Sequence, residues 1–312
     1  MRIYEDGQFD KNNGCALALG SFDALHIAHT KLIKKTIECA QGYGVRSGVH
    51  MFFERIENVI FPNTTNKSIY TNEQRIEIIE HLGADFLYFE NFDVDFMNMS
   101  AYDFAKMLKE KFAVVCVVVG FDYTFGRGGE GNAQLLKEYG KAFGFDVVIM
   151  DAYKICDEIV SSTNVREFIK NGNIEKANEL LGRKYCLCGE IIHDRGVGHK
   201  LGVPTANINF ENSVILPKNG VYAGFVELCG QKYTCVVNIG IRPTFSLDKM
   251  SVEVHIIDFD DDLYGEKMCV YLIKRLRQEK NFDTDDALVE QILEDIDIAK
   301  DLFLHDKTEK IK

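Results

Sequence analysis

The sequence predicts two domains: an α/β domain built around a mostly parallel sheet, and an antiparallel β-barrel that ends in a helix. Three observations support this prediction. Apolar strand-like segments alternate with amphipathic helical segments up to about residue 150, strand-like segments then follow one another without helices after Gly182, and an amphipathic stretch closes the chain. The length of 312 residues also favours two domains over one.

The first domain begins with the apolar run CALAL at 15–19, which has the composition of a buried strand. Leu32, Ile33, Ile37 and Ala40 then recur at helical spacing and predict a helix that ends near residue 40. The alternation continues through SGVHMFF, NEQRIEIIEHLG, DFLYFE, AYDFAKMLKEKF, AVVCVVVG, AQLLKEYGKAF and FDVVIMD. Apolar strands separated by amphipathic helices are typical of a parallel sheet that is covered on both faces.

Two short helical segments, NVREFIKNG and NIEKANELLG, connect the halves, and each is followed by a glycine that can end a helix. Next come KYCLCGEII, VYAGFVELC, KYTCVVNIG, SVEVHIIDF and KMCVYLIKRL, separated by Gly, Asp and Asn turns, which predict a small antiparallel barrel or sandwich. Apolar residues from about Thr284 to Phe303 lie on one helical stripe. We place the boundary near residue 183, which gives domains 1–183 and 184–312.

Composition excludes several classes of protein. A chain that is 46% apolar with only four prolines is an ordered globular protein. Its longest apolar runs are too short to cross a bilayer, and its acidic beginning does not resemble a secretory leader. A formal net charge of -12 argues against binding of nucleic acid. The nine cysteines contain no CxxC pair, and we expect them to be buried free thiols in a reducing cytoplasm.

The stretch GSFDALHIAH at 20–29 joins the first strand to the first helix. Gly20 and Asp23 are turn residues, and the spacing places His26 and His29 on one face of the helix's first turn. Free backbone N–H groups favour an anion at this position, so the two imidazoles can bind a triphosphate. A structural histidine pair is about equally compatible with this segment taken alone, and metal ligation is a weaker alternative because no third ligand is nearby.

Two further stretches in this half have features of a ligand site. GFDYTFGRGGEGN at 120–132 contains five glycines, follows the most apolar strand, and carries aromatic side chains that can pack on a flat ring. A flexible surface loop is the alternative. VSSTNVR at 160–166 places three hydroxyl residues and Arg166 at a helix start, where N-capping explains one hydroxyl and phosphate binding the others.

The second half contains GVGHKLGVPTANINF at 196–210 and SVEVHIIDF at 251–259. In extended backbone the Thr205 hydroxyl and the Asn207 amide project to the same side, where both can offer oxygen to a hard cation such as Mg²⁺. A plain turn that enters a strand is equally compatible with this segment. Glu253 lies on the polar face of its strand, and it can act as a general base if that face turns toward Thr205 and Asn207.

These stretches together resemble the bacterial bifunctional riboflavin kinase/FAD synthetase family over nearly the whole chain. GSFDALHIAH is similar to the family's GxFDGxHxGH motif, GFDYTFGRGGEG to its flavin-loop motif and VSSTNVR to its ISSTxIR motif. GHKLGVPTAN, NGVYAG, NIGIRPTF and SVEVHIIDFDDDLYG resemble consecutive kinase motifs. The resemblance implies a Rossmann-like nucleotidyltransferase domain followed by a riboflavin kinase-type barrel.

The resemblance implies two reactions and the residues that serve them. In the second domain the riboflavin 5'-hydroxyl attacks the γ-phosphate of ATP, with Glu253 as base and with Thr205 and Asn207 around Mg²⁺. In the first domain the FMN phosphate attacks the α-phosphate of a second ATP, with His26, His29 and Arg166 stabilising charge. We expect contacts with ATP or flavin from the following motif residues: Gly20, Phe22, Asp23, Gly120, Asp122, Phe125, Ser162, Thr163, Gly196, Gly198, Lys200, Gly202, Pro204, Thr205 and Asn207.

The first domain departs from the family pattern at two places. Ala24 and Ala28 stand where the family usually has glycine, and FFERIEN at 52–58 lacks the family's FEPHP. The alternatives to a bifunctional enzyme are a riboflavin kinase with a degenerate adenylyltransferase domain and a non-catalytic flavin or nucleotide sensor. In each case the expected partners are riboflavin, FMN and ATP, in the cytoplasm, without nucleic acid, membrane or an obligate protein partner.

Overall fold

The computed structural model describes residues 1–5, 9–11, 13–61, 66–193, 202–242 and 249–309. They form two compact units, Met1–Ser162 and Thr163–Lys312. The units divide ahead of the boundary at residue 183 that the sequence predicts, because helix α8 (Ile174–Leu181) packs on barrel strands β11 (Tyr185–Ile192) and β16 (Lys267–Arg277).

The first unit is built on a six-stranded parallel sheet with strand order β1-β4-β3-β2-β5-β8. CALAL at 15–19 forms β2 near the middle of the sheet, and all five of its residues are buried. The remaining strands are β1 (Arg2–Tyr4), β3 (Arg46–Phe52), β4 (Phe86–Glu90), β5 (Val114–Gly120) and β8 (Asp146–Met150).

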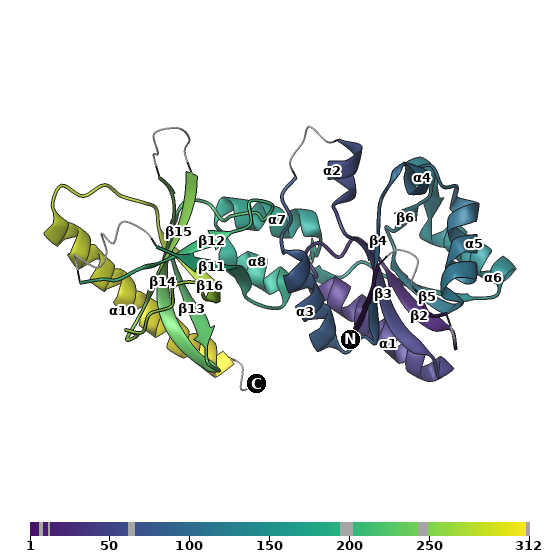
Figure 1. Ribbon diagram of the computed structural model, residues 1–312, viewed down its shortest axis with the longest axis horizontal. Helices are drawn as coiled ribbons and strands as arrows, with labels where there is room; N and C mark the ends of the chain where they lie inside the picture. Colours follow the sequence, from purple (N-terminus) through teal and green to yellow (C-terminus); the bar gives the residue numbers. More distant parts are fainter. Residues whose placement is uncertain (6–8, 12, 62–65, 194–201, 243–248, 310–312) are drawn as a thin grey trace. The chain divides into compact units, whose positions relative to one another are not determined.

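Helices cover both faces of this sheet (Figure 1). Helices α1 (Ile27–Tyr43) and α3 (Asn72–Leu82) bury Leu32, Ile33 and Ile79 against one face. Helices α5 (Ala101–Phe112) and α6 (Ala133–Phe143) cover the other face, where Phe104 and Leu136 contact the alternate side chains of the strands. The alternating α/β architecture predicted from the sequence is therefore confirmed.

Several short elements were not predicted from the sequence. Most lie in the connections that follow the strands. They are α2 (Ile56–Ile60), α4 (Val94–Met97), β6 (Thr124–Phe125), the 3₁₀ turn η1 (Arg127–Gly129), β7 (Gly131–Asn132), β9 (Lys154–Ile155) and β10 (Glu158–Ile159). None is longer than five residues, and elements this short carry too few residues for a periodicity to be recognised.

The second unit contains α7 (Ser162–Asn171), which begins at the unit boundary, and α8, followed by a closed barrel of strand order β11-β12-β15-β14-β13-β16. All neighbouring barrel strands are antiparallel. The strands not yet located are β12 (Ala206–Phe210), β13 (Gly220–Leu228), β14 (Gln231–Arg242) and β15 (Lys249–Ile256). The barrel is thus confirmed over the sandwich alternative.

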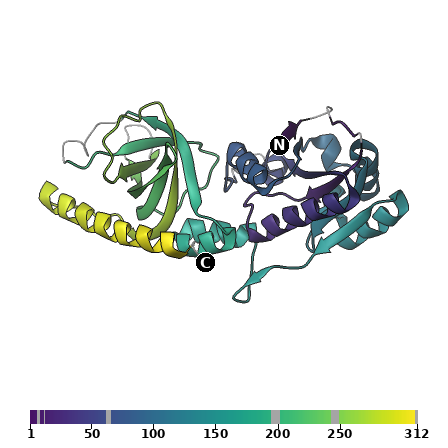
Figure 2. The same ribbon diagram turned by 90° about the horizontal axis from the view of Figure 1, so that it is seen from below.

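The terminal helix α10 (Asp285–Glu309) lies along the outside of the barrel (Figure 2, yellow). Ile296 and Ala299 pack against Val221 and Val236 of strands β13 and β14. An ion pair supplements this apolar contact: Arg277 Nε donates to both carboxylate oxygens of Asp295 at 3.1 and 3.0 Å, and Nη2 donates at 2.8 Å. The predicted terminal helix is confirmed, and it covers one side of the barrel.

Replacing Asp295 with alanine is expected to destabilise the barrel by about 3 kcal/mol, because the Arg277 guanidinium then lacks its buried partner. The Asp295 side chain is only 3% exposed, and that of Arg277 15% exposed. Urea unfolding measures the free energy. The matched control is Lys300→Ala on the same helix, which removes an exposed ion pair with Asp258 and is expected to cost less than about 1 kcal/mol. Equal losses in the two variants would contradict this prediction.

The cysteines differ from the expectation of free thiols at one pair. Cys188 of β11 and Cys269 of β16 are directly opposed in the barrel and form a disulfide. Cys15, Cys116 and Cys235 are buried free thiols as expected, whereas Cys156 and Cys229 are exposed. The expectation was wrong for the bonded pair because the sequence spacing of two cysteines 81 residues apart does not reveal that their strands are neighbours.

Candidate functional site

The turn from β2 to α1 places both histidines of GSFDALHIAH at the start of a long helix. His26 is the N-cap residue, and its Nδ1 accepts the backbone N–H of His29 at 3.2 Å. Phe22 and Leu25 adopt positive φ angles of 49° and 43°, so the chain turns sharply between the strand and the helix. This geometry places the turn at the carboxyl edge of the sheet, where open α/β sheets bind ligands.

The two imidazole rings are stacked with centroids 3.7 Å apart and planes 19° apart. The buried Phe22 ring packs edge-to-face against the His29 ring, with centroids 5.1 Å apart. Because His26 Nδ1 already accepts an amide hydrogen, a neutral His26 ring carries its proton on Nε2, where it is a donor. The pair is therefore fixed in orientation and can offer N–H groups to one anionic ligand.

Asp23 lies in the same turn and is almost completely buried. Its carboxylate accepts Arg55 Nη1 at 3.0 Å and the backbone N–H of Ile69 at 3.2 Å. Burial raises the pKa of Asp23, and the Arg55 guanidinium opposes that rise. From α3, Arg75 Nη2 donates to the carbonyls of Ser21 at 3.1 Å and Phe52 at 3.2 Å. Sequence reasoning assigned a role to neither Arg55 nor Arg75, since neither lies in a recognisable motif.

The glycine-rich loop after β5 begins at the same edge of the sheet. A methyl group on Gly120 would lie 3.0 Å from Asp122 Oδ1, and one on Gly126, where φ is +77°, would lie 2.8 Å from the backbone nitrogen of Ala101. Only glycine therefore fits at position 126. Phe125 is 7% exposed and packs against Phe104, with ring centroids 5.1 Å apart. Most of the Phe125 ring thus contacts protein, which leaves only an edge for the predicted ligand contact.

Ala24 and Ala28 do not strain the backbone of the turn. Ala24 is not among the described non-glycine residues with positive φ, and Ala28 lies in the first turn of α1. Alanine is the residue most favourable to a helix at such a position.

The third predicted segment, VSSTNVR at 160–166, is divided by the unit boundary: Ser162 ends the first unit, and Thr163 and Arg166 lie in the second. Their grouping with the histidines stays a prediction.

In the barrel, the strand register brings Asn207 and Glu253 together. Asn207 of β12 is directly opposite Glu253 of β15, and Glu253 is in turn directly opposite Asn238 of β14. Directly opposed residues of antiparallel strands project to the same side. The face of β15 that carries Glu253 therefore turns toward Asn207, as a general base at Glu253 requires. Asn238 was missed as a site residue, although it begins the motif NIGIRPTF.

The segment before β12 adjoins this row of three side chains. Gly202 has a φ of +75°, and the Pro204 carbonyl oxygen is 2.8 Å from His255 Nδ1, two residues after Glu253. Thr205 immediately precedes the strand, and Asn207 is 8% exposed. The other predicted residues of this loop, Gly196, Gly198 and Lys200, lie outside the described residues.

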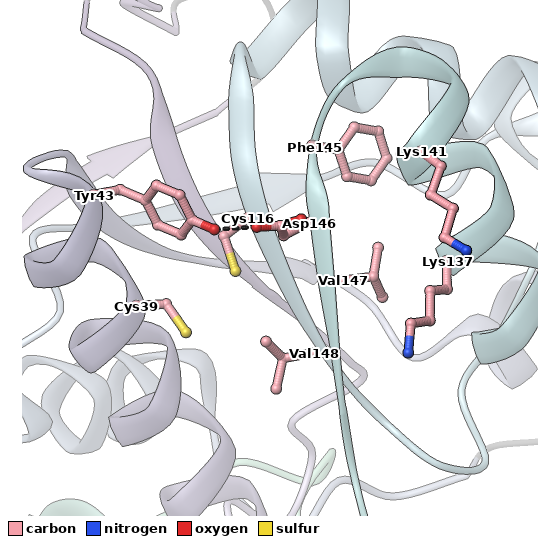
Figure 3. Close-up of a pocket in the computed structure, with 9 residues that line it drawn as sticks. All are labelled: Cys39, Tyr43, Cys116, Lys137, Lys141, Phe145, Asp146, Val147 and Val148. Carbon is pink, nitrogen blue, oxygen red and sulfur yellow. Dashed lines mark hydrogen bonds between the residues drawn. The ribbon is translucent and has the colours of Figure 1, made fainter.

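A pocket of about 250 Å³ in the first unit lies elsewhere (Figure 3). Cys39 and Tyr43 of α1, Cys116 of β5 and Asp146 of β8 line it together with two lysines of α6, Lys137 and Lys141. The Tyr43 hydroxyl donates a hydrogen bond to Asp146, which raises the pKa of Tyr43 to about 12. Asp146 begins its strand, so the pocket is at the opposite edge of the sheet from the histidines. It does not include the predicted catalytic residues.

Within the described parts of the chain, no group of three or more His, Cys, Asp or Glu side chains is arranged to hold a metal ion. Asn207 and Thr205 nevertheless supply oxygen atoms, the ligand type that Mg²⁺ prefers, and Mg²⁺ usually combines few protein ligands with substrate phosphates. The donor set thus fits Mg²⁺ bound together with a nucleotide.

In the described residues, no helix combines the length and the apolar character that crossing a membrane requires.

Two family models match the chain in tandem: FAD synthetase over residues 8–164 and riboflavin kinase over residues 181–303. Curated relatives named bifunctional riboflavin kinase/FMN adenylyltransferase include one from Buchnera aphidicola, 33% identical over 94% of this chain and 95% of the relative. Another, from Bacillus subtilis, is 34% identical over 89% of each.

The fold also matches a solved structure named a macrolide-efflux protein, from Streptococcus pneumoniae. Its TM-score is 0.90 at 28% identity, over 96% of this chain and 99% of that one.

Proposed function

Because the chain belongs to the bifunctional riboflavin kinase/FMN adenylyltransferase family, and so phosphorylates riboflavin and adenylylates FMN, we propose which residues carry each reaction. Riboflavin phosphorylation is assigned to the row formed by Asn207, Glu253 and Asn238. Adenylyl transfer is assigned to the stacked pair His26 and His29. The observation that carries the first assignment is the direct opposition of Asn207 and Glu253 across two strands.

In the kinase reaction, Glu253 accepts the proton of the riboflavin 5'-hydroxyl as its oxygen attacks the γ-phosphorus of ATP; FMN and ADP are the products. The Asn207 amide and the Thr205 hydroxyl contact the phosphates of ATP. These two residues would also hold Mg²⁺, whose chemistry would be the neutralisation of phosphate charge. Gly202 and Pro204 shape the approach to these phosphates, and the resemblance adds Gly196, Gly198 and Lys200.

In the adenylyl transfer, a phosphate oxygen of FMN attacks the α-phosphorus of ATP, and pyrophosphate leaves. The nucleophile is already an anion, so the site requires alignment and charge stabilisation more than a base. His26 and His29 supply N–H donors for the charge that develops on the leaving pyrophosphate. The motif resemblance adds Arg166, with the hydroxyls of Ser162 and Thr163, as a second group of phosphate ligands.

The functional domains are proposed as 1–183 for adenylyl transfer and 184–312 for the kinase. The family models, which end at 164 and begin at 181, are compatible with this division. The small-molecule substrates are compatible with a cytoplasmic enzyme without an obligate protein partner, and the net charge of -12 argues against binding of nucleic acid.

The test is a time course of purified protein with riboflavin, ATP and Mg²⁺, in which riboflavin, FMN and FAD are separated by chromatography. We expect FMN to appear first and then to pass to FAD, and we expect a chelator of divalent cations to stop both steps. Accumulation of FMN without FAD, under oxidising and reducing conditions alike, would show that the first domain has lost adenylyl transfer. No FMN at all would exclude the kinase assignment.

A further inference from the structure

Arg55 stands in the segment FFERIEN, where the chain departs from its family, and it bonds to three different parts of the first unit. It is the N-cap residue of α2. Its Nη1 donates to Asp23 at 3.0 Å and to the Lys67 carbonyl at 3.3 Å, and its Nη2 donates to Glu57 at 3.2 Å. The Arg55 side chain is only 16% exposed. One guanidinium therefore joins the β2–α1 turn to the chain on either side of residues 62–65.

The environment of Asp23 indicates what this contact does. The Asp23 side chain is 11% exposed, and the backbone N–H of Ile69 donates a hydrogen bond to it. A buried carboxylate needs a cation close by to stay charged, and Arg55 is a cation in direct contact with Asp23. Arg75 contributes more weakly, since its guanidinium bonds to the carbonyls of Ser21 and Phe52 and to Asn72.

Asp23 precedes the N-cap His26 by three residues in one turn of unusual backbone. If Asp23 shifts, the start of α1 and both imidazoles shift with it. Loss of Arg55 would also leave more net negative charge at Asp23 beside the site proposed for an anionic nucleotide. Both effects weaken the binding of ATP in its ground state and its transition state alike, so they raise KM more than they lower kcat.

We propose that Arg55 is a positioning residue for adenylyl transfer, which acts through Asp23 to hold the β2–α1 turn in the conformation that binds ATP. This inference rests on the assignment of His26 and His29 to adenylyl transfer. It also accounts for the absence of FEPHP from this chain. The ion pair between Arg55 and Asp23 fixes the segment 52–58, where the family motif has two prolines.

The experiment is a double-mutant cycle of Arg55→Met and Asp23→Asn, read as KM for ATP and kcat of FAD formation from FMN. Riboflavin phosphorylation by the same protein samples serves as the internal measure of folded enzyme. Arg55→Met is expected to raise KM for ATP about tenfold or more, while Arg55→Lys, which keeps a cation for Asp23, stays within about threefold. In the Asp23→Asn background, Arg55→Met is expected to change KM by less than about threefold. Arg2→Met, an exposed arginine on β1, is the matched control.

Equal effects of Arg55→Met in both backgrounds would overturn the proposal, because Arg55 would then act without Asp23. An unchanged KM in Arg55→Met would overturn it as well. The assignment of the histidines is tested separately by His26→Asn. If His26→Asn loses FAD formation while Arg55→Met has a normal KM, the assignment of the histidines stands and only the inference on Arg55 is refuted.

Discussion

Glu253→Gln is expected to lower the rate of riboflavin phosphorylation by about 10² to 10⁴, the usual contribution of a positioned general base. Glutamine keeps the size and hydrogen-bonding capacity of the side chain beside Asn207 and Asn238, but it cannot accept the proton of the attacking hydroxyl. The effect should appear in kcat, with KM for ATP changed little, because the proton is transferred only in the transition state. Chromatographic measurement of FMN formation at saturating riboflavin tests this expectation.

The matched control is Glu227→Gln, the same chemical change at an exposed position on barrel strand β13. It is expected to keep normal rates of both reactions. Adenylyl transfer to FMN supplied from outside should also be normal in Glu253→Gln, since that reaction belongs to the first unit. A Glu253→Gln protein that forms FMN at the normal rate would refute the assignment of the base.

His26→Ala is expected to have two effects, which a second variant separates. It removes the N-cap of α1, which should destabilise the first unit by about 1 kcal/mol, and it removes an imidazole donor from the site, which should lower FAD formation by about 10² to 10³. His26→Asn restores the cap, because asparagine is among the best N-cap residues. We therefore expect His26→Asn to unfold like the wild type in urea while FAD formation stays low.

FMN formation in both His26 variants should be unchanged and thereby confirms that the second unit is intact. Recovery of FAD formation in His26→Asn along with stability would mean that His26 serves only the helix. The structural-pair interpretation of the two histidines, which the sequence left open, would then be the right one.

Long elements with a strong period were predictable from the sequence. CALAL and the segments at 101–112 and 133–143 form the expected elements with the expected bounds, because each is decided by local apolar spacing. The barrel strands were also recognised, since apolar runs are separated there by turn residues. What a local pattern could not decide was barrel versus sandwich, which depends on whether β11 pairs with both β12 and β16.

The candidate sites were predictable only to the level of motifs. His26 and His29 were found because their spacing and their helix belong to one stretch of chain. Glu253 required the strand register, which decides whether its face meets Asn207, and no residue near Glu253 in the sequence reports that register. The pairing of Arg55 with Asp23 joins residues 32 positions apart, and no repeating pattern relates them.

The register of β15 also makes one misfolded form of the barrel unfavourable. Side chains alternate along a strand, so slipping β15 by one residue against β12 would present Val252 or Val254 to Asn207 and turn Glu253 toward the side that these valines occupy. Val252 is 1% exposed and Val254 0% exposed, so the slipped form would bury a carboxylate in an apolar core, at a cost of several kcal/mol. The register that would separate Glu253 from Asn207 is therefore also one that buries a carboxylate in the barrel core, so a stably closed barrel keeps these two side chains on the same side.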